Sequence, residues 1–158
     1  MSHATADLYD EYGDSLQVAT PMFTSYGGKK KFSGMISTVK CHEDNSYVRS
    51  TLEQSGNGKV LVVDGGGSLR CALLGDMLAE LGIKNGWSGV VVYGCIRDSG
   101  EIGAMDIGVK ALNTNPKKSL KKDIGERDVT VTFAGVNFIP GHYLYADEDG
   151  IVVSDKEV

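Results

Sequence analysis

Two uninterrupted apolar runs constrain the fold of this chain more than any other feature. The first, KVLVVD, spans residues 59–64, and the second, GVVVY, spans residues 89–93. Between them, residues 68–81 space their apolar side chains as a helix does. Strands without an alternating polar face are buried on both sides, as the strands of parallel sheets are. The strand–helix–strand order therefore predicts an α/β fold with parallel neighbouring strands.

Shorter patterns surround this core, and each predicts one further element. Helices are expected over residues 5–12, with Thr5 as the N-cap, and from the Asn45-Ser46 cap to about residue 54. The expected strands outside the core are residues 32–41, 129–133, 136–139, 142–146 and 150–153. The last four follow one another across glycine-containing turns, which is typical of antiparallel strands. We therefore expect one α/β domain over residues 1–158, with a parallel core and an added antiparallel part.

Charge and composition argue against several classes of function. The net charge is −5 and the lysine clusters at residues 29–31 and 117–122 are short, so we interpret these clusters as solvated loops and expect no direct nucleic-acid contact. No apolar run reaches the ~18 residues of a membrane span, and the polar, acidic start does not resemble a signal peptide. The three cysteines form no CxxC pair, which suits a reducing cytoplasm.

The first core strand leads into a loop with three glycines, DGGG at residues 64–67. Such loops let backbone amides approach a ligand closely, as they do in methyltransferases and dinucleotide-binding proteins. However, the sequence has no GxGxxG and no acidic residue at the end of the next strand, so a structural tight turn is at least as well supported. Arg70 lies one helical turn beyond the glycines. It is expected either to face the pocket or to form a salt bridge at the surface or an interface.

The dipeptide Gly75-Asp76 interrupts the helical pattern after this loop. Glycine costs about 1 kcal/mol in a helix interior relative to alanine, and aspartate is a favoured N-cap. One interpretation is a short helix, a break, and a second helix that begins at Asp76. The amides of Met77 and Leu78 would then form an anion site for a small carboxylate. The alternative is one continuous helix with Asp76 on its solvent face.

The second core strand leads into Arg97-Asp98. Arginine offers a planar, permanently charged donor pair for a carboxylate or keto oxygen, and aspartate is a hard oxygen ligand for Mg²⁺. A surface pair without function is the alternative, since such pairs contribute only about 0–1 kcal/mol. Both loops follow neighbouring parallel strands, and open α/β sheets bind ligands at the carboxyl ends of their strands. Asp76, Arg97 and Asp98 are therefore expected to converge.

A family resemblance is carried by the stretch VLVVDGGGSLRCALLGDMLAELGIKNGWSGVVVYGCIRDSGEI. It resembles the family of the regulator of ribonuclease activity A, which also contains divalent-metal class II aldolases for 4-hydroxy-4-methyl-2-oxoglutarate. The aldolase signature is an Asp, twenty residues and then Arg-Asp, and Asp76 with Arg97-Asp98 matches it without a gap. The resemblance extends to VATPMFTSYGGKKKFSGMISTVKCHEDN near the start and FAGVNFIPGHYLYADEDGIVV near the end.

The resemblance implies a fold, an assembly and an activity. The fold is the swivelling β/β/α domain of the RraA-like proteins, and the assembly is a ring-shaped homotrimer or a higher oligomer with active sites between subunits. The activity is that of a lyase, which cleaves 4-hydroxy-4-methyl-2-oxoglutarate to pyruvate. Oxaloacetate decarboxylation is implied as a secondary activity, because both reactions leave the enolate of pyruvate.

The resemblance also implies a role for each site residue. The implied substrate-binding residues are Gly75, Asp76, Met77, Leu78 and Arg97. Backbone amides around Asp76 hold the pyruvyl carboxylate of a small 2-oxo acid, and Arg97 contacts its keto oxygen. Asp98 ligates a divalent cation, Mg²⁺ or Mn²⁺, and Asp76 orients metal-bound water. The implied catalytic residues are thus Arg97 and Asp76.

The same family allows a second function, which is a protein that inhibits ribonuclease E by binding it without touching RNA. The acidic charge of the chain favours this function. Asp98 favours the enzyme, because a pure binding protein needs no metal ligand at that position. The two functions are compatible with each other.

Overall fold

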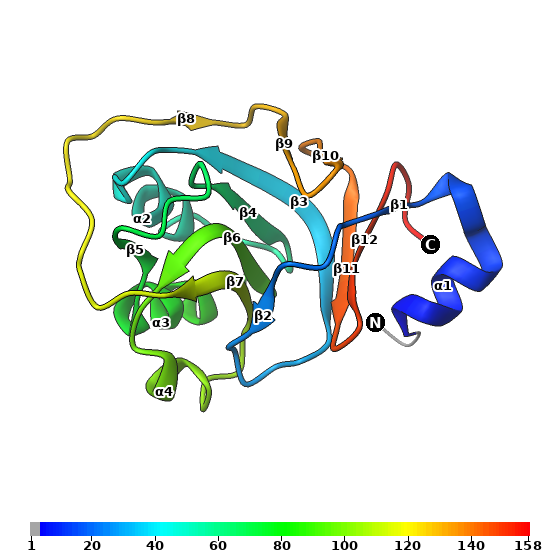
Figure 1. The fold of residues 1–158 in the computed structure, drawn as a ribbon, viewed down its shortest axis with the longest axis horizontal. Helices are drawn as coiled ribbons and strands as arrows, with labels where there is room; N and C mark the ends of the chain where they lie inside the picture. The colour runs from blue at the N-terminus through cyan, green and yellow to red at the C-terminus, as the bar shows by residue number, and fades with distance from the viewer. Residues whose placement is uncertain (1–3) are drawn as a thin grey trace.

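The parallel core predicted from the sequence is present in the computed structural model, which describes residues 4–158 (Figure 1). Four strands follow one another in parallel, and they are β3 (Phe32–Lys40), β4 (Val60–Asp64), β6 (Gly89–Ile96) and β7 (Gly108–Thr114). β6 runs three residues beyond the predicted apolar run. Its register with β7 shifts between Val92 and Cys95, and the strand then continues to the loop that carries Arg97.

Strand β3 joins the parallel part to an antiparallel part. Its second half pairs in parallel with β4, whereas its first half pairs antiparallel with β11 (Tyr143–Asp147). The order of the sheet is β1-β12-β11-β3-β4-β6-β7-β2. The remaining strands on this path are β1 (Gln17–Val18), β2 (Thr24–Ser25) and β12 (Gly150–Ser154). The mixed α/β fold, with parallel and antiparallel strands in one sheet, is therefore confirmed.

Four short strands of the described residues lie off this path. β9 (Val131–Phe133) and β10 (Val136–Phe138) form a separate hairpin, and β8 (Glu126–Arg127) pairs with the end of β3. β5 (Ala72–Leu74) pairs in parallel with the end of β6. The antiparallel strands predicted for the last third of the chain are confirmed, each within two residues at either end.

Helices cover one face of the parallel strands. α2 (Ser46–Leu52) and α3 (Asp76–Lys84) pack there, and the short α4 (Ser99–Ile102) follows β6. α1 (Thr5–Tyr12) and a 3₁₀ turn (Gly13–Ser15) lie at the opposite end of the molecule, beside β12 (Figure 1). No helix formed by the described residues has the length and apolarity to cross a membrane.

Strand β4 explains why the core strands have no polar face. Leu61 and Val63 pack under the helices, whereas Val60 and Val62 pack toward the antiparallel strands and the β9–β10 hairpin. All four side chains are completely buried. Successive strand residues point to opposite faces, so a strand covered on both faces is apolar throughout.

Two predictions about helices were wrong. Residues 68–74 form no helix, because Ala72, Leu73 and Leu74 extend as β5 against the end of β6 and are buried. Their apolar spacing fits a short buried strand as well as a helix. Thr5 is the first helical residue of α1 and not its N-cap, which is Ala4.

Candidate active site

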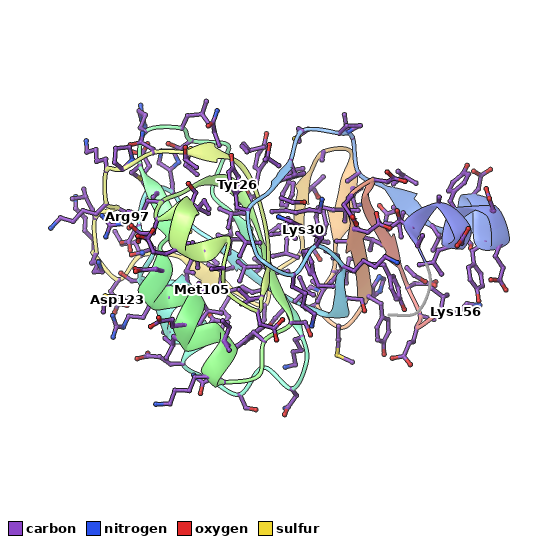
Figure 2. All side chains as sticks on the ribbon, turned by 90° about the horizontal axis from the view of Figure 1, so that it is seen from below. Tyr26, Lys30, Arg97, Met105, Asp123 and Lys156 are labelled. Carbon is purple, nitrogen blue, oxygen red and sulfur yellow. The ribbon has the colours of Figure 1, made fainter. Side chains whose placement is uncertain are left out.

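Asp76, Arg97 and Asp98 lie at the carboxyl ends of the parallel strands, and Figure 2 places Arg97 at the end of the molecule away from helix α1. The backbone N–H of Asp76 donates to Oδ2 of Asp98 at 3.0 Å. The N–H of Arg97 donates to the carbonyl of Leu74 at 2.9 Å. Hydrogen bonds thus join the two loops, and the predicted convergence of these three residues is confirmed.

Asp98 has an unusual backbone conformation at this junction. Its φ of 56° and ψ of 38° lie in the left-handed helical region, where aspartate is tolerated better than most residues. The carbonyl of Asp98 accepts from Ile102 at 2.9 Å, which fixes the turn into α4. This conformation holds the carboxylate against the first amide of helix α3.

The two carboxylates influence each other strongly. Hydrogen bonding with Asp98, followed by burial, raises the pKa of Asp76. The pKa of Asp98 is lowered, chiefly because it accepts the backbone amide of Asp76, and the positive charge of Arg97 contributes to the same effect. Asp98 is therefore held in its anionic form, which is the form that ligates a cation.

Gly75 leaves room for the close approach of these groups. A Cβ at this position would lie 2.8 Å from Oδ2 of Asp98 and 3.4 Å from Nε of Arg97. The φ of Gly75 is −126°, which any residue can adopt, so the constraint is space and not backbone conformation. Glycine therefore lets the Arg97-Asp98 pair pack against the start of α3.

All the site residues predicted from the sequence line one cavity of about 100 Å³, and they are Gly75, Asp76, Met77, Leu78, Arg97 and Asp98. The cavity is smaller than the roughly 300–1,000 Å³ of drug-sized ligand sites, which fits a compact ligand. A second hollow of about 280 Å³ shares Arg97 and Asp98 with it. Since α3 begins at Asp76, the amides of Met77 and Leu78 have no carbonyl four residues earlier within the helix.

Three cationic residues at the same cavity were missed by the sequence analysis. Lys118 and Lys121, from the segment interpreted as a solvated loop, line the cavity together with Arg49 from α2. That interpretation was incomplete, because the segment crosses the carboxyl end of the sheet. No local pattern distinguishes these two lysines from Lys117 and Lys122 beside them.

Asn45 is a further residue that the sequence analysis did not assign to the site. It lines the cavity, and its Nδ2 donates to the carbonyl of Leu73 at 3.3 Å. Among residues 4–158, its Oδ1 is the one buried side-chain oxygen or nitrogen atom without a hydrogen-bond partner. Buried polar atoms are rarely left unpaired, so this atom indicates a donor supplied by a ligand or water.

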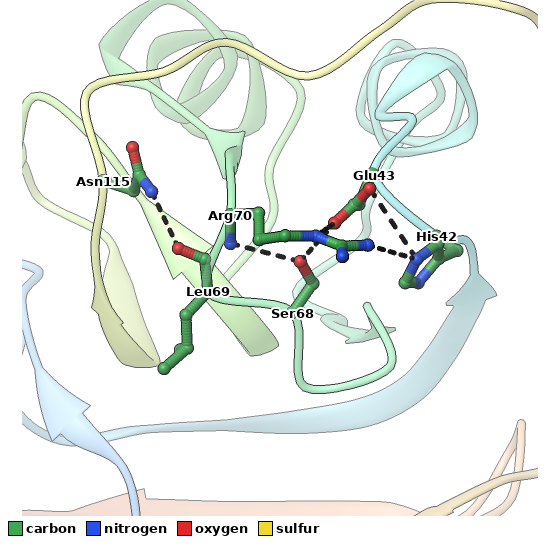
Figure 3. A network of polar contacts seen from close by, with 6 residues as sticks. All are labelled: His42, Glu43, Ser68, Leu69, Arg70 and Asn115. Atoms are coloured by element: carbon green, nitrogen blue, oxygen red, sulfur yellow. Dashed lines mark hydrogen bonds and ion pairs between the residues drawn. The ribbon is translucent and has the colours of Figure 1, made fainter.

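Arg70 does not lie in a helix and does not line this cavity. Its Nε lies 2.6 Å from Oε2 of Glu43, and Ser68 donates to the same oxygen at 2.6 Å (Figure 3). The hydrogen bonds from Arg70 and then Ser68 lower the pKa of Glu43 to about 2. Of the two alternatives for Arg70, the salt bridge is the one observed.

The glycine loop packs against the protein itself. A Cβ on Gly65 would lie 2.5 Å from Cδ1 of Leu73, and a Cβ on Gly67 would lie 3.2 Å from the ring of Tyr93. Gly67 also has a φ of 73°, which glycine adopts without strain. These contacts favour the structural tight turn.

A divalent cation fits the donors that are present. Residues 4–158 contain no group of three or more His, Cys, Asp or Glu side chains with metal-site geometry. Magnesium, however, binds through only one or two protein carboxylates, with waters and substrate oxygens as its other ligands. Asp98, with Asp76 beside it and space for a small ligand, provides such a set.

Comparisons with known proteins support the same family. The sequence profile of the RraA-like family, described as Aldolase/RraA, matches residues 5–153. A protein from Alkalilimnicola ehrlichii, provisionally named 4-hydroxy-4-methyl-2-oxoglutarate aldolase, is 64% identical over 98% of this chain and 96% of its own length. A relative from Dechloromonas aromatica with the same name is 62% identical over 99% of this chain and 98% of its own.

Two solved structures share the fold closely. One, from Geobacillus kaustophilus, is described as an S-adenosylmethionine:2-dimethylmenaquinone methyltransferase, with a TM-score of 0.97 and 55% identity over 99% of this chain and 97% of its own. The other is described as the RNA-processing inhibitor RraA from Thermus thermophilis, with a TM-score of 0.96 and 45% identity over 100% of this chain and 96% of its own. The chain therefore belongs to the RraA-like family, which comprises aldolases and RraA proteins.

Proposed function

We propose that this chain is a divalent-metal-dependent class II aldolase, a lyase that cleaves 4-hydroxy-4-methyl-2-oxoglutarate into two molecules of pyruvate. One observation carries the proposal, which is that Asp76, Arg97 and Asp98 lie on one small cavity with the first amides of α3. The names of relatives at 62% and 64% identity point to the same reaction.

The start of helix α3 binds the carboxylate of the substrate. The amides of Met77 and Leu78 donate to it, and the partial positive charge of the helix N-terminus stabilises its negative charge. Arg97 donates to the keto oxygen at C2, where negative charge develops in the transition state. These contacts orient the bond between C3 and C4.

In the cleavage step, the C4 hydroxyl gives its proton to a water molecule and its oxygen forms a carbonyl with C4. The C3–C4 bond breaks, and its electrons form the enolate of pyruvate, which is then protonated at C3. Asp98 would hold a Mg²⁺ or Mn²⁺ ion, which would supply Lewis-acid stabilisation of the negative charge of the enolate. Asp76, whose pKa is raised, holds a water molecule beside the substrate.

Loss of CO₂ from oxaloacetate leaves the same enolate. We therefore propose oxaloacetate decarboxylation as a secondary activity of the same residues. Arg97 and the amides of α3 would serve it unchanged, because the reacting pyruvyl part is identical.

Coupled detection of released pyruvate tests the proposal. We expect turnover of the aldol substrate with Mg²⁺ or Mn²⁺, no turnover in EDTA, and recovery when metal is restored. Arg97→Ala should lower kcat by about 10²–10³, the usual cost of losing one donor at a developing oxyanion. An equal rate in EDTA or in Arg97→Ala would remove the metal or Arg97 from the mechanism.

We also propose that the chain assembles as a homotrimer or a higher oligomer. Exposed apolar side chains border the site, including Met77 and Leu120, and exposed apolar patches often mark contacts between proteins. Light scattering during gel filtration tests this. A trimer has three times the 16.9 kDa mass of the chain, and a monomer at micromolar concentration would contradict the assembly.

A second candidate function is binding to ribonuclease E as a protein inhibitor. The 45% identity and TM-score of 0.96 to the RNA-processing inhibitor from Thermus thermophilis favour it. A pull-down with the ribonuclease as bait tests it, with Arg97→Ala as a control that should still bind. No capture at micromolar concentration would argue against this function.

A further inference from the structure

The candidate active site is cationic although the chain is acidic. Arg49, Arg97, Lys118 and Lys121 line the cavity, and only Asp76 and Asp98 oppose them, whereas the whole chain carries a net charge of −5. A bound divalent ion would add further positive charge. Such a concentration of cations indicates a ligand with more than one negative charge.

The backbone around both lysines is fixed by hydrogen bonds. The carbonyl of Lys117 accepts from the amide of Ala72 at 2.8 Å, and the amide of Leu120 donates to the carbonyl of Glu43 at 3.0 Å. The amide of Lys122 donates to Oδ2 of Asp44 at 2.8 Å. Lys118 and Lys121 therefore extend from an anchored segment that lies against β5 and the loop between β3 and α2.

Neither lysine is neutralised by the protein. Across residues 4–158, no carboxylate oxygen lies within 4.0 Å of the Nζ atom of Lys118 or Lys121, whereas Arg49 lies 3.7 Å from Glu53. Both lysines are exposed, and both line the cavity that contains Arg97. They are therefore available to a ligand that already occupies the Arg97 end of the cavity.

Asn45 lines the same cavity, and its Oδ1 atom is buried without a hydrogen-bond partner. This atom accepts hydrogen bonds and is hidden from solvent, so a carboxylate cannot satisfy it but a hydroxyl can. A hydroxyl donor and a second negative charge are thus the two features that this part of the cavity requires in a ligand.

We propose that Lys118 and Lys121 form a subsite for the second carboxylate of a dicarboxylic 4-hydroxy-2-oxo acid, and that Asn45 accepts a hydrogen bond from its 4-hydroxyl. The inference rests on the proposed aldolase function and assigns the residues that select among its substrates. Lys118 and Lys121 determine specificity, and Arg97 and Asp98 perform the chemistry common to all pyruvyl substrates.

Two substrates and one exchange reaction separate these roles. The dicarboxylic substrate is 4-hydroxy-4-methyl-2-oxoglutarate, and the monocarboxylic one is 4-hydroxy-2-oxopentanoate, which yields pyruvate and acetaldehyde. Exchange of the methyl protons of pyruvate for deuterium in D₂O, followed by NMR, reports enolate formation without any distal group. All three are measured on the metal-loaded full chain.

Lys118→Ala and Lys121→Ala should each lower kcat/KM for the dicarboxylic substrate about tenfold, mainly through KM, since each removes one charged hydrogen-bond donor. The monocarboxylic substrate and the exchange rate should change less than twofold. Lys117→Ala and Lys122→Ala are matched controls, because these neighbours do not line the cavity, and they should leave all three rates unchanged. Asn45→Ala should slow both 4-hydroxy substrates equally and spare the exchange.

Equal losses on both substrates in the Lys118 and Lys121 variants would overturn the subsite, as would equal effects in the Lys117 and Lys122 controls. The unmodified chain could also catalyse exchange and cleave both substrates with equal kcat/KM. That result would overturn the subsite but leave the aldolase function intact. An unmodified chain with neither exchange nor cleavage would instead overturn the aldolase function, and the subsite with it.

Discussion

Among the proposed site residues, Asp98 is the one with a strained backbone conformation. Its left-handed backbone conformation is unusual for a residue with a side chain, and strained residues cluster at functional sites. The hydrogen bond from the amide of Asp76 and the turn into α4 maintain this conformation. These hydrogen bonds therefore fix the orientation of the Asp98 carboxylate, which we propose as the metal ligand.

Gly75→Ala should lower the aldolase activity while the protein stays folded. The added Cβ would lie 2.8 Å from Oδ2 of Asp98, so the carboxylate must move away from the start of α3. We expect a loss of about tenfold or more in kcat/KM, since an error of about 1 Å in a positioned group can cost 10²-fold. Gly100→Ala is the control, because a Cβ there meets nothing within 4 Å. Equal activity in the two variants would contradict the packing constraint.

Glu43→Gln should destabilise the protein more at neutral pH than in acid. Hydrogen bonds from Arg70 and Ser68 lower the folded-state pKa of Glu43 from 4.5 to about 2. The stabilisation that depends on this charge is therefore complete above pH 4.5 and is lost as the pH falls through 2. Urea unfolding at several pH values tests this. A difference in the free energy of unfolding between variant and unmodified chain that does not change with pH would be inconsistent with it.

The convergence of Asp76, Arg97 and Asp98 could be predicted from sequence, because parallel strands bring their carboxyl ends to one edge of a sheet. The contribution of Lys118 and Lys121 could not. They come from a segment without apolar periodicity, and they reach the site through backbone hydrogen bonds to Ala72 and Glu43 that no local pattern encodes.

At the scale of elements, β5 is where local pattern and tertiary structure disagree. The predicted helix over residues 68–81 is divided by Gly75 into a buried strand and the true helix α3. Beyond the end of β4, strand β6 has a free edge, and pairing along it satisfies the backbone of residues 72–74. This pairing is non-local, so the sequence alone did not reveal it.

Helix α1 is attached to the sheet by Asp147 and not by a cap of its own. The backbone N–H and the hydroxyl of Thr5 donate to Asp147 at 2.8 and 2.7 Å. Burial opposes ionisation of this carboxyl, yet its accepted hydrogen bonds leave its pKa lowered. The last residue of β11 thus supplies the N-terminal cap of a helix more than 140 residues away in sequence.

Asp147→Asn should lower the free energy of unfolding by about 1–2 kcal/mol, the range for losing a helix cap or a charged hydrogen bond. Asp149→Asn on the turn between β11 and β12 is the control, because its side chain is exposed. Chemical denaturation measures both. Equal stability of the two variants would mean that Asp147 does not anchor α1.

At the scale of the whole molecule, the long strand β3 joins the antiparallel part of the sheet to the parallel part. Its antiparallel half pairs with β11. Its parallel half pairs with β4 and leads to the edge of the sheet where the candidate active site lies. The parallel pairing of β4 and β6 could be predicted from their apolar runs, whereas strand β7 and the parallel pairing of β3 with β4 were not predicted. The continuity of parallel and antiparallel strands in one sheet could not be predicted, because it depends on pairing between residues 32–35 and 143–146.

The central claim is that loops from two neighbouring strands together hold one metal ion and one guanidinium over a pyruvyl group. Anomalous scattering from crystals grown with Mn²⁺ and pyruvate tests it most directly. We predict a manganese peak within coordination distance of a carboxylate oxygen of Asp98, with pyruvate bound beside the ion and Arg97. Pyruvate and manganese bound away from Asp98, or an Asp98→Asn variant that binds both unchanged, would contradict the account.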